Sequence, residues 1–203
     1  MALIEKLKKS EISKIVDNRI REFKDINRNS SDMLFNELCF CILTANFNAE
    51  KCILIQNKIG DGFSTLSERE LARSLKNFGH RYPNTRAKYI KCSMKYKDSL
   101  KNIIKLYKGN QLRDWLVENI KGIGYKESSH FLRNIGFDNF AIIDFHIVDL
   151  LERYKLIKKP KSLTKVKYLE IENMLKDIAT KLSLTPAELD LYLWYVETGK
   201  ILK

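Results

Sequence analysis

Long apolar runs are missing from this 203-residue chain, and none approaches the length that a membrane-spanning helix needs. The first residues, MALIEKLKKSE, carry charges where a secretory signal peptide needs its apolar centre. These absences argue against a membrane protein and against an ordinary secreted one. We therefore expect an intracellular protein, cytoplasmic or nucleoid-associated, with no membrane partner.

Cysteines are few, and none of the four belongs to a CxxC pair or lies at ligand spacing from a histidine. Cys39 and Cys41 lie in an apolar stretch, which is typical of small core residues in a reducing compartment. We expect no metal site and no disulfide from them.

Strand-type alternation is also missing, whereas apolar residues recur at helical spacing along nearly the whole chain. Capping boxes at Ser67–Glu70 and Thr185–Glu188 indicate two helix starts. The pattern predicts an all-α fold of about ten helices with short connections.

Acidic residues are in the minority, with 25 Asp and Glu against 37 Lys and Arg, which gives a net charge of +12. A folded domain this basic favours a polyanionic partner, most often nucleic acid. The alternative is a generic lysine-rich surface without a specific partner.

Glycine is scarce, yet two of the eight glycines lie close together in IKGIGYKESSHF, residues 120–131, between two helical segments. A helix–hairpin–helix fits this pattern, because Gly122 and Gly124 permit a tight turn. The amides of Ile123, Gly124 and Tyr125 would then point outward at a helix N-terminus, where backbone N–H groups bind phosphate. The alternative is an ordinary corner between two helices.

Two residues near the hairpin suggest chemistry. Lys126 lies in the first turn of the following helix, where partial burial would favour the neutral, nucleophilic amine. Asp144, in AIIDFHIVDLL, could stabilise a developing cation at the mouth of a cleft. Eighteen positions separate them, enough for one short helix and a return loop. The alternatives are one more phosphate contact for Lys126 and a helix N-cap for Asp144, and His146 is expected to be structural.

Longer segments carry a family resemblance. LVENIKGIGYKESSHFLRNIG followed by AIIDFHI resembles the hairpin, loop and aspartate signature of the HhH-GPD superfamily of DNA glycosylases. NELCFCILTANFNAEK and GHRYPNTRAKYI resemble an early helix and a GFYxxKAxxI region of the same superfamily, so the likeness covers roughly residues 35 to 150. Lys126 matches the catalytic lysine and Asp144 the aspartate. Lys121 replaces the usual proline before the hairpin, which leaves the backbone cradle intact and adds charge.

Within the superfamily, the chain is most similar to the short archaeal-type 8-oxoguanine DNA glycosylase/AP lyase. No cysteine follows Cys92, so the four-cysteine iron–sulfur cluster of other branches is not expected. The resemblance implies two helical subdomains with the hairpin at a DNA-binding cleft between them. The expected boundaries are 1–34, which packs with the C-terminal part; 35–138, a helical barrel that includes the hairpin at 112–135; and 139–203.

The implied activity is removal of 8-oxoguanine from double-stranded DNA and nicking of the abasic strand through a lysine Schiff base. The implied enzyme is a monomer that needs no cofactor. Alternatives are a glycosylase for another lesion, such as an oxidised pyrimidine, or a non-catalytic hairpin module that only binds the DNA backbone.

Further residues follow from the same resemblance. Base-pocket candidates are Tyr82, His130, Asp190, Trp194 and Lys203, whose C-terminal carboxylate reads the base in this branch. Trp194 and His130 could instead only pack in the core, and Asp190 could lie on the surface. Asn46 would fill the gap left by the flipped base, or simply cap a helix. DNA contacts are expected at Lys121, Gly122, Ile123, Gly124 and Tyr125, and a structural monovalent cation at the carbonyls of Glu118, Ile120 and Ile123.

Deletion of Lys203 tests the expected base-reading carboxylate. The deletion should weaken binding to a duplex with 8-oxoguanine more than binding to the same undamaged duplex, because the terminal carboxylate then ends one residue short of the damaged base. Titration of both duplexes measures the ratio of the two affinities. Equal losses on the two duplexes would refute the role.

Overall fold

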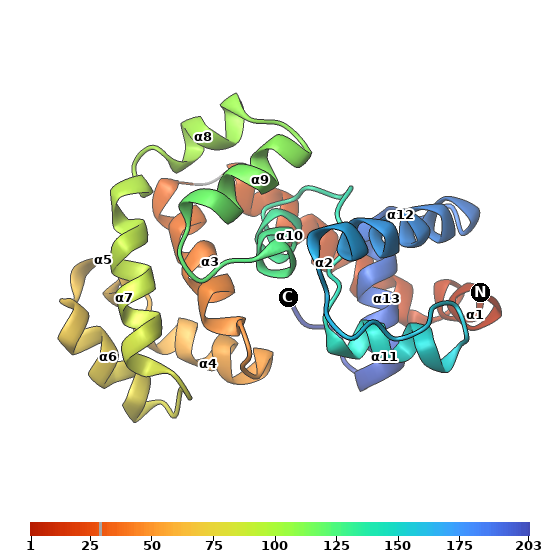
Figure 1. Ribbon diagram of the computed structural model, residues 1–203, viewed down its shortest axis with the longest axis horizontal. Coiled ribbons are helices and arrows are strands. Elements are labelled where there is room, and N and C mark those ends of the chain that lie inside the picture. Colours follow the sequence, from red (N-terminus) through yellow and green to blue (C-terminus); the bar gives the residue numbers. More distant parts are fainter. Residues whose placement is uncertain (29) are drawn as a thin grey trace. The chain divides into compact units, whose positions relative to one another are not determined.

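The computed structural model describes residues 1–28 and 30–203. This described part contains thirteen α-helices, one short 3₁₀-helix and no strand, which confirms the all-α prediction (Figure 1). None of its helices is long and apolar enough to cross a membrane. The helices are α1 (Ala2–Lys8), α2 (Glu11–Arg28), α3 (Ser31–Thr44), α4 (Ala49–Ile59), α5 (Gly62–Thr65), α6 (Glu68–Asn77), α7 (Pro83–Ser93), η1 (Met94–Tyr96), α8 (Leu100–Leu106), α9 (Asn110–Asn119), α10 (Tyr125–Asn134), α11 (Phe145–Arg153), α12 (Lys165–Lys181) and α13 (Pro186–Thr198).

Local capping chemistry explains where several helices begin. Both predicted capping boxes are present, at the start of α6 and of α13, with the two reciprocal hydrogen bonds that define the motif. The helix count is higher than predicted, because α1 and α5 are only 7 and 4 residues long and show little periodicity. Helix α7 begins at Pro83, where the fixed φ of proline suits a first turn.

The chain divides into two compact units. Residues 26–131 form one of them, called unit 2. Helix α3 forms its centre and packs against α4, α7 and α8. Residues 38–43 of α3 are completely buried, and Cys39 and Cys41 are among them. The prediction that these cysteines are small core residues is therefore confirmed.

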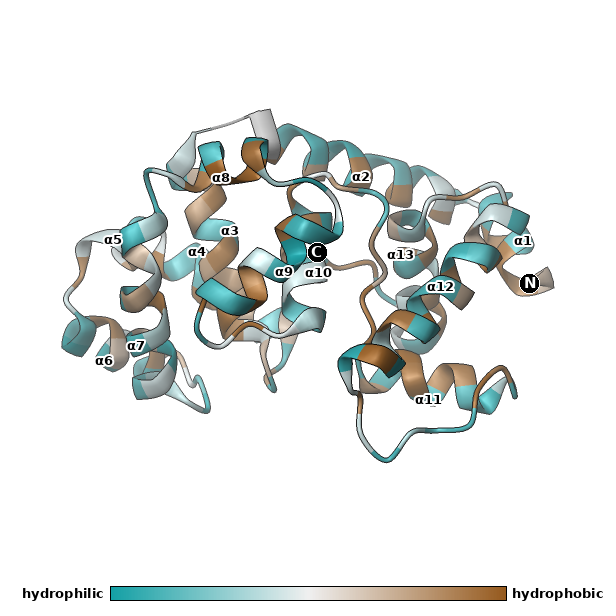
Figure 2. Ribbon diagram, turned by 45° about the horizontal axis from the view of Figure 1, so that its top comes forward, coloured by the Kyte–Doolittle hydropathy of each residue, from teal (hydrophilic) through white to brown (hydrophobic). Residues whose placement is uncertain are grey.

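Residues 1–25 and 132–203 form the other unit, called unit 1, in which α13 is the central helix. Helices α1, α11 and α12 all pack against α13. Leu189, Leu191 and Tyr192 of α13 are buried there, together with Asp190. Helix α2, most of which belongs to this unit, is mainly hydrophilic with separate hydrophobic patches (Figure 2).

The two boundaries between the units fall inside helices. One lies after Asp25 in α2 and the other after Phe131 in α10, whereas the sequence prediction placed them after residues 34 and 138. Helix α10 therefore begins in unit 2 at the hairpin and ends in unit 1.

Gly136 follows α10 at a place where unit 1 leaves no room for a side chain. Its φ is +92°, and a Cβ there would lie 2.8 Å from Cα of Lys24 and 3.1 Å from the carbonyl oxygen of Phe23. Because both neighbours are backbone atoms of α2, they cannot move aside as a flexible side chain can. Gly136 thus permits close packing between the end of α10 and α2.

Gly136→Ala should lower the free energy of unfolding by about 2–4 kcal/mol, from left-handed strain and the backbone clash together. Gly199→Ala is the matched control, since its φ is +71° but its Cβ would meet nothing within 4 Å. The free energy of unfolding of this control should fall by only about 1–2 kcal/mol, from the left-handed strain alone. Urea denaturation of both variants measures the difference, and equal losses would show that the contact with α2 is unimportant.

Candidate DNA-binding hairpin and catalytic residues

The predicted hairpin lies between α9, which ends at Asn119, and α10, which begins at Tyr125. Gly122 adopts a φ of +82°, a conformation that residues with a side chain rarely adopt. A Cβ at this position would lie 2.3 Å from Cδ2 of Tyr89, so the aromatic ring of α7 packs directly on the glycine. The tight turn therefore requires glycine for both conformation and space.

Contacts between α9 and α10 hold the hairpin in shape. Arg113 of α9 is completely buried and donates a hydrogen bond of 3.2 Å to Oγ of Ser129 in α10. Its guanidinium also lies 5.1 Å from the centre of the Tyr125 ring, and the Tyr125 hydroxyl donates to Asp114. These contacts fix the angle at which α10 leaves the turn.

The hairpin amides are only partly open to a phosphate. The Gly124 N–H donates to Oε2 of Glu127 at 3.1 Å, so a phosphate at this amide would have to replace the carboxylate. The side chain of Ile123 is buried, whereas Lys121 is exposed. Lys121 therefore has the freedom to reach a DNA backbone, as its sequence position suggested.

Lys126 is half-buried in the first turn of α10. Among the described residues no carboxylate forms an ion pair with its amine. The thiol of Cys52 lies within electrostatic reach of this amine. Burial raises the pKa of Cys52 to about 12, and the positive charges of Lys126 and Arg86 partly offset that rise. The buried thiol of Cys52 stays neutral and therefore offers Lys126 no counter-charge.

Arg86 of α7 lies in the same region, and sequence reasoning missed it. Its guanidinium is buried and donates to the carbonyl oxygen of Ala45, and burial lowers its pKa while Glu127 and the tyrosine Tyr89 oppose that change. Nothing in GHRYPNTRAKYI distinguishes this arginine from a surface one. Its burial depends on the packing of α7 against α3, which local sequence does not reveal.

Tyr82 and its neighbours form an aromatic and cationic group at the start of α7. Tyr82 is 36% exposed, and the guanidinium groups of Arg81 and Arg86 lie 5.1 and 5.8 Å from its ring centre. His80 hydrogen-bonds to the Leu43 carbonyl through Nε2, at 3.1 Å, and Nδ1 accepts from the Tyr82 N–H, at 3.0 Å. The proton of His80 is therefore on Nε2, and burial lowers the pKa of the ring.

Asn46 and His130 are placed differently within unit 2. Asn46 is exposed just after α3, with a φ of +55° that asparagine tolerates better than most residues. His130 is buried in α10, and its ring meets Phe40 edge to face at 5.5 Å. Asn46 is thus accessible to a partner, whereas the buried ring of His130 contacts Phe40.

Asp144 belongs to unit 1, where it caps α11. Its Oδ1 accepts from the Ile147 N–H at 3.0 Å, and the residue is half-buried, so one carboxylate oxygen serves the predicted N-cap role. His146, two residues later, is exposed and meets the Trp194 ring edge to face at 5.3 Å. The indole Nε1 of Trp194 is buried and has no hydrogen-bond acceptor among the described residues.

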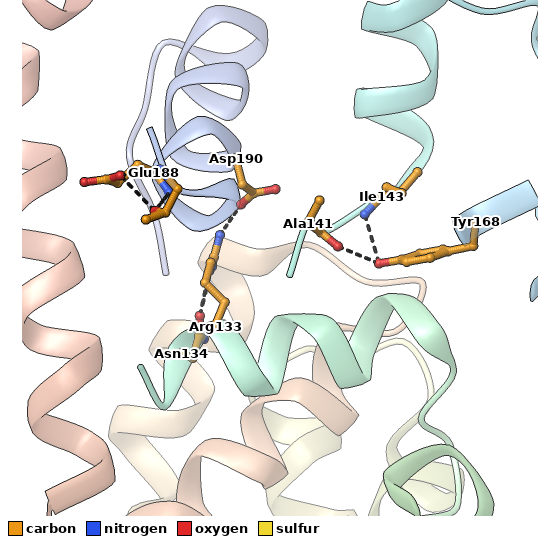
Figure 3. Close-up of polar contacts among 8 residues, drawn as sticks. Arg133, Asn134, Ala141, Ile143, Tyr168, Glu188 and Asp190 are labelled. Carbon is orange, nitrogen blue, oxygen red and sulfur yellow. Dashed lines mark hydrogen bonds and ion pairs between the residues drawn. The ribbon is translucent and has the colours of Figure 1, made fainter. Parts of the chain in front are cut away.

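Asp190 is buried in α13, so the alternative that placed it on the surface is wrong. Arg133 of α10 donates to its carboxylate (Figure 3), and the backbone of Ile142 forms a further hydrogen bond with it. Burial nevertheless raises the pKa of Asp190 to about 6, with a smaller upward contribution from Asp144. Lys203, the last pocket candidate of unit 1, is half-buried.

The candidate residues therefore fall into two groups, one in each unit. Unit 2 holds the hairpin and Lys126, with Asn46, Tyr82 and His130. Unit 1 holds a smaller group made up of Asp144, Asp190, Trp194 and Lys203.

An all-helical chain with a glycine hairpin, a lysine in the next turn and a helix-capping aspartate defines a helix–hairpin–helix protein of the DNA glycosylase class. The chain belongs to the 8-oxoguanine DNA glycosylase family, whose model matches residues 16–184. This match confirms the resemblance seen in the sequence.

Individual relatives agree with the family assignment over nearly the full chain. The 8-oxoguanine DNA glycosylase/AP lyase of Methanocaldococcus jannaschii is 54% identical over 98% of this chain and 97% of its own. A crystal structure of the M. jannaschii enzyme with a 15mer DNA containing 8-oxoguanine matches with a TM-score of 0.97, at 52% identity over 100% of this chain and 98% of that one. The 8-oxoguanine DNA glycosylase of Thermotoga maritima matches with a TM-score of 0.93, at 43% identity over 98% and 96%.

Gly122→Ala tests the hairpin. The alanine should displace the Tyr89 ring and distort the turn, lowering the affinity for duplex DNA about tenfold, which is the effect of losing one or two backbone contacts. Gly79→Ala is the matched control, with a φ of +78° and open space around the new Cβ. Fluorescence anisotropy with a labelled duplex measures both affinities, and an unchanged affinity in Gly122→Ala would contradict the hairpin as a DNA contact.

Proposed function

We infer that this chain is a bifunctional 8-oxoguanine DNA glycosylase/AP lyase of base-excision repair. Its family and its relatives support the substrate and both activities. The observation that carries the mechanism is Lys126, whose amine has no ion-pair partner in the described structure and lies directly after the hairpin.

Base removal begins with flipping of the damaged nucleotide out of the duplex. Neutral Lys126 attacks C1′ of the sugar, the bond from C1′ to the base breaks, and the base leaves with the bonding electrons. The carboxylate of Asp144 stabilises the positive charge that develops on the sugar and helps to orient the amine. Its second oxygen is the one available for this role, because Oδ1 caps α11.

The lyase activity follows from the same covalent bond. Opening of the sugar ring turns the adduct into a Schiff base between Lys126 and C1′. Loss of a proton from C2′ then expels the 3′-phosphate by β-elimination and nicks the strand. A lysine nucleophile therefore brings strand cleavage with it, whereas an activated water would stop at base removal.

DNA is the partner that the charge of +12 favours, and the relative crystallised with 8-oxoguanine DNA supports this choice. We assign Lys121, Gly122, Ile123, Gly124 and Tyr125 to the DNA backbone and Asn46 to the gap left by the flipped base. Tyr82, His130, Trp194 and Lys203 remain the candidates for the base pocket. Trp194 adds an indole N–H that has no acceptor among the described residues, which suits a lesion contact.

No cofactor is needed for this reaction, because Lys126 supplies the nucleophile. A structural monovalent cation fits the hairpin through the carbonyls of Glu118, Ile120 and Ile123. In the described turns, none of these three carbonyl oxygens accepts a backbone hydrogen bond, so they retain lone pairs for a hard cation. The cation would hold the turn and attract a phosphate. The enzyme acts as a monomer, either in the cytoplasm or associated with the nucleoid.

Borohydride trapping tests the nucleophile. With a duplex carrying 8-oxoguanine, the wild-type protein should form a covalent protein–DNA adduct upon reduction, because borohydride reduces the Schiff base. Lys126→Gln should form none and should lose both base removal and strand cleavage by several orders of magnitude. Denaturing gel electrophoresis detects the adduct and the nicked strand.

Lys121→Gln is the control, since it removes a lysine charge from the same hairpin and leaves the nucleophile in place. It should weaken binding but retain trapping at high protein concentration. An adduct that survives Lys126→Gln unchanged would show that another amine reacts. Trapping only on a duplex with an oxidised pyrimidine would assign a different lesion to the same chemistry.

A further inference from the structure

The backbone just before Asp144 is held by side chains and not by a neighbouring strand. Residues 138–144 contain no helix or strand, although residues 140–143 are buried. Buried backbone N–H and C=O groups need hydrogen-bond partners, and an irregular segment must find them elsewhere. Two helices of unit 1, α12 and α13, supply these partners.

Tyr168 of α12 makes two of the bonds. Its hydroxyl donates to the Ala141 carbonyl at 2.8 Å and accepts from the Ile143 N–H at 3.3 Å, so one phenol joins the backbone on both sides of Ile142 (Figure 3). The side chain is only 2% exposed, and water therefore cannot easily replace the hydroxyl.

Two carboxylates complete the set. Glu172, one turn after Tyr168, is 1% exposed and accepts from the Ala141 N–H at 3.3 Å. Asp190 of α13 bonds the backbone of Ile142, and Arg133 donates to the same carboxylate. Consecutive residues 141, 142 and 143 are thus each bonded by a buried side chain.

The other side of Asp144 is fixed by α11. The carboxylate of Asp144 accepts from the Ile147 N–H, and its backbone carbonyl accepts from the Val148 N–H at 3.0 Å. The direction in which the carboxylate points is therefore set jointly by the start of α11 and by residues 141–143. A carboxylate that stabilises a developing cation must be held within a fraction of an ångström to be effective.

We propose that Tyr168, Glu172 and Asp190 are positioning residues for the reaction, which act by holding residues 141–143 so that Asp144 is presented to the sugar. The inference rests on the proposed function of Asp144. It gives Asp190 a role different from the base contact suggested by its place in the sequence, because its carboxylate is already engaged by Arg133 and Ile142.

Tyr168→Phe removes only the hydroxyl and is the sharpest test. Base excision is measured in single turnover with saturating protein, so that differences in DNA affinity do not affect the rate. We expect Tyr168→Phe to slow excision about tenfold, the effect of a small misplacement of Asp144. Tyr192→Phe is the matched control, a buried tyrosine of unit 1 outside the group that bonds residues 141–143, and it should excise at the wild-type rate.

A double-mutant cycle separates positioning from general destabilisation. In an Asp144→Asn background, Tyr168→Phe should slow excision no further, because the residue through which it acts is already removed. An equal slowing in both backgrounds, or no slowing in either, would overturn the inference. Melting temperatures of all variants show whether each is folded at the assay temperature.

Two more measurements keep the inference testable if Tyr168→Phe is unstable. Glu172→Leu should slow excision more than Glu172→Gln, because only glutamine retains an oxygen that accepts from the Ala141 N–H. Amide hydrogen exchange at Ile143 should accelerate in Tyr168→Phe whatever the catalytic result, and unchanged exchange would refute the contact. Absence of excision by the wild-type protein would overturn the proposed function, whereas normal wild-type excision with an unaffected Tyr168→Phe would overturn only the positioning role.

Discussion

The buried ion pair between Arg133 and Asp190 constrains the packing of unit 1, because neither charge can be buried there without the other. Arginine keeps its charge even when buried, so Arg133 requires a carboxylate, and loss of either partner would leave an unpaired buried charge at a cost of about 3–5 kcal/mol. The pair joins α10 to α13, and the guanidinium also lies 5.0 Å from the ring of Phe23 in α2. Three helices that are distant in sequence thus meet at one charge pair.

The same carboxylate connects this framework to the candidate catalytic aspartate. Asp190 bonds the backbone of Ile142, two residues before Asp144. Arg133 lies about two helical turns after Lys126 on α10, so the helix that begins with the proposed nucleophile ends at the ion pair. The ion pair that stabilises unit 1 therefore also holds the backbone that leads to Asp144.

Local rules predicted much of the fold and part of the site. Capping boxes, the N-cap role of Asp144 and the tight turn at Gly122 depend on a few neighbouring residues, and the structure contains all three. The burial of Arg86 and the paired bonds of Tyr168 could not be predicted, because each involves residues 25 or more positions away. Arginine and tyrosine are compatible with both surface and core, so their identity carries no signal about such contacts.

The amino-acid sequence by itself determined the all-α class, the hairpin, the identity of the proposed nucleophile and the family, since these depend on periodicity, glycine placement and a long shared pattern. Only the tertiary structure decided that Asp190 is engaged with Arg133 and that side chains of α12 and α13 hold residues 141–143. The physical reason is that a buried polar group must find its partner wherever the packed helices bring one within reach.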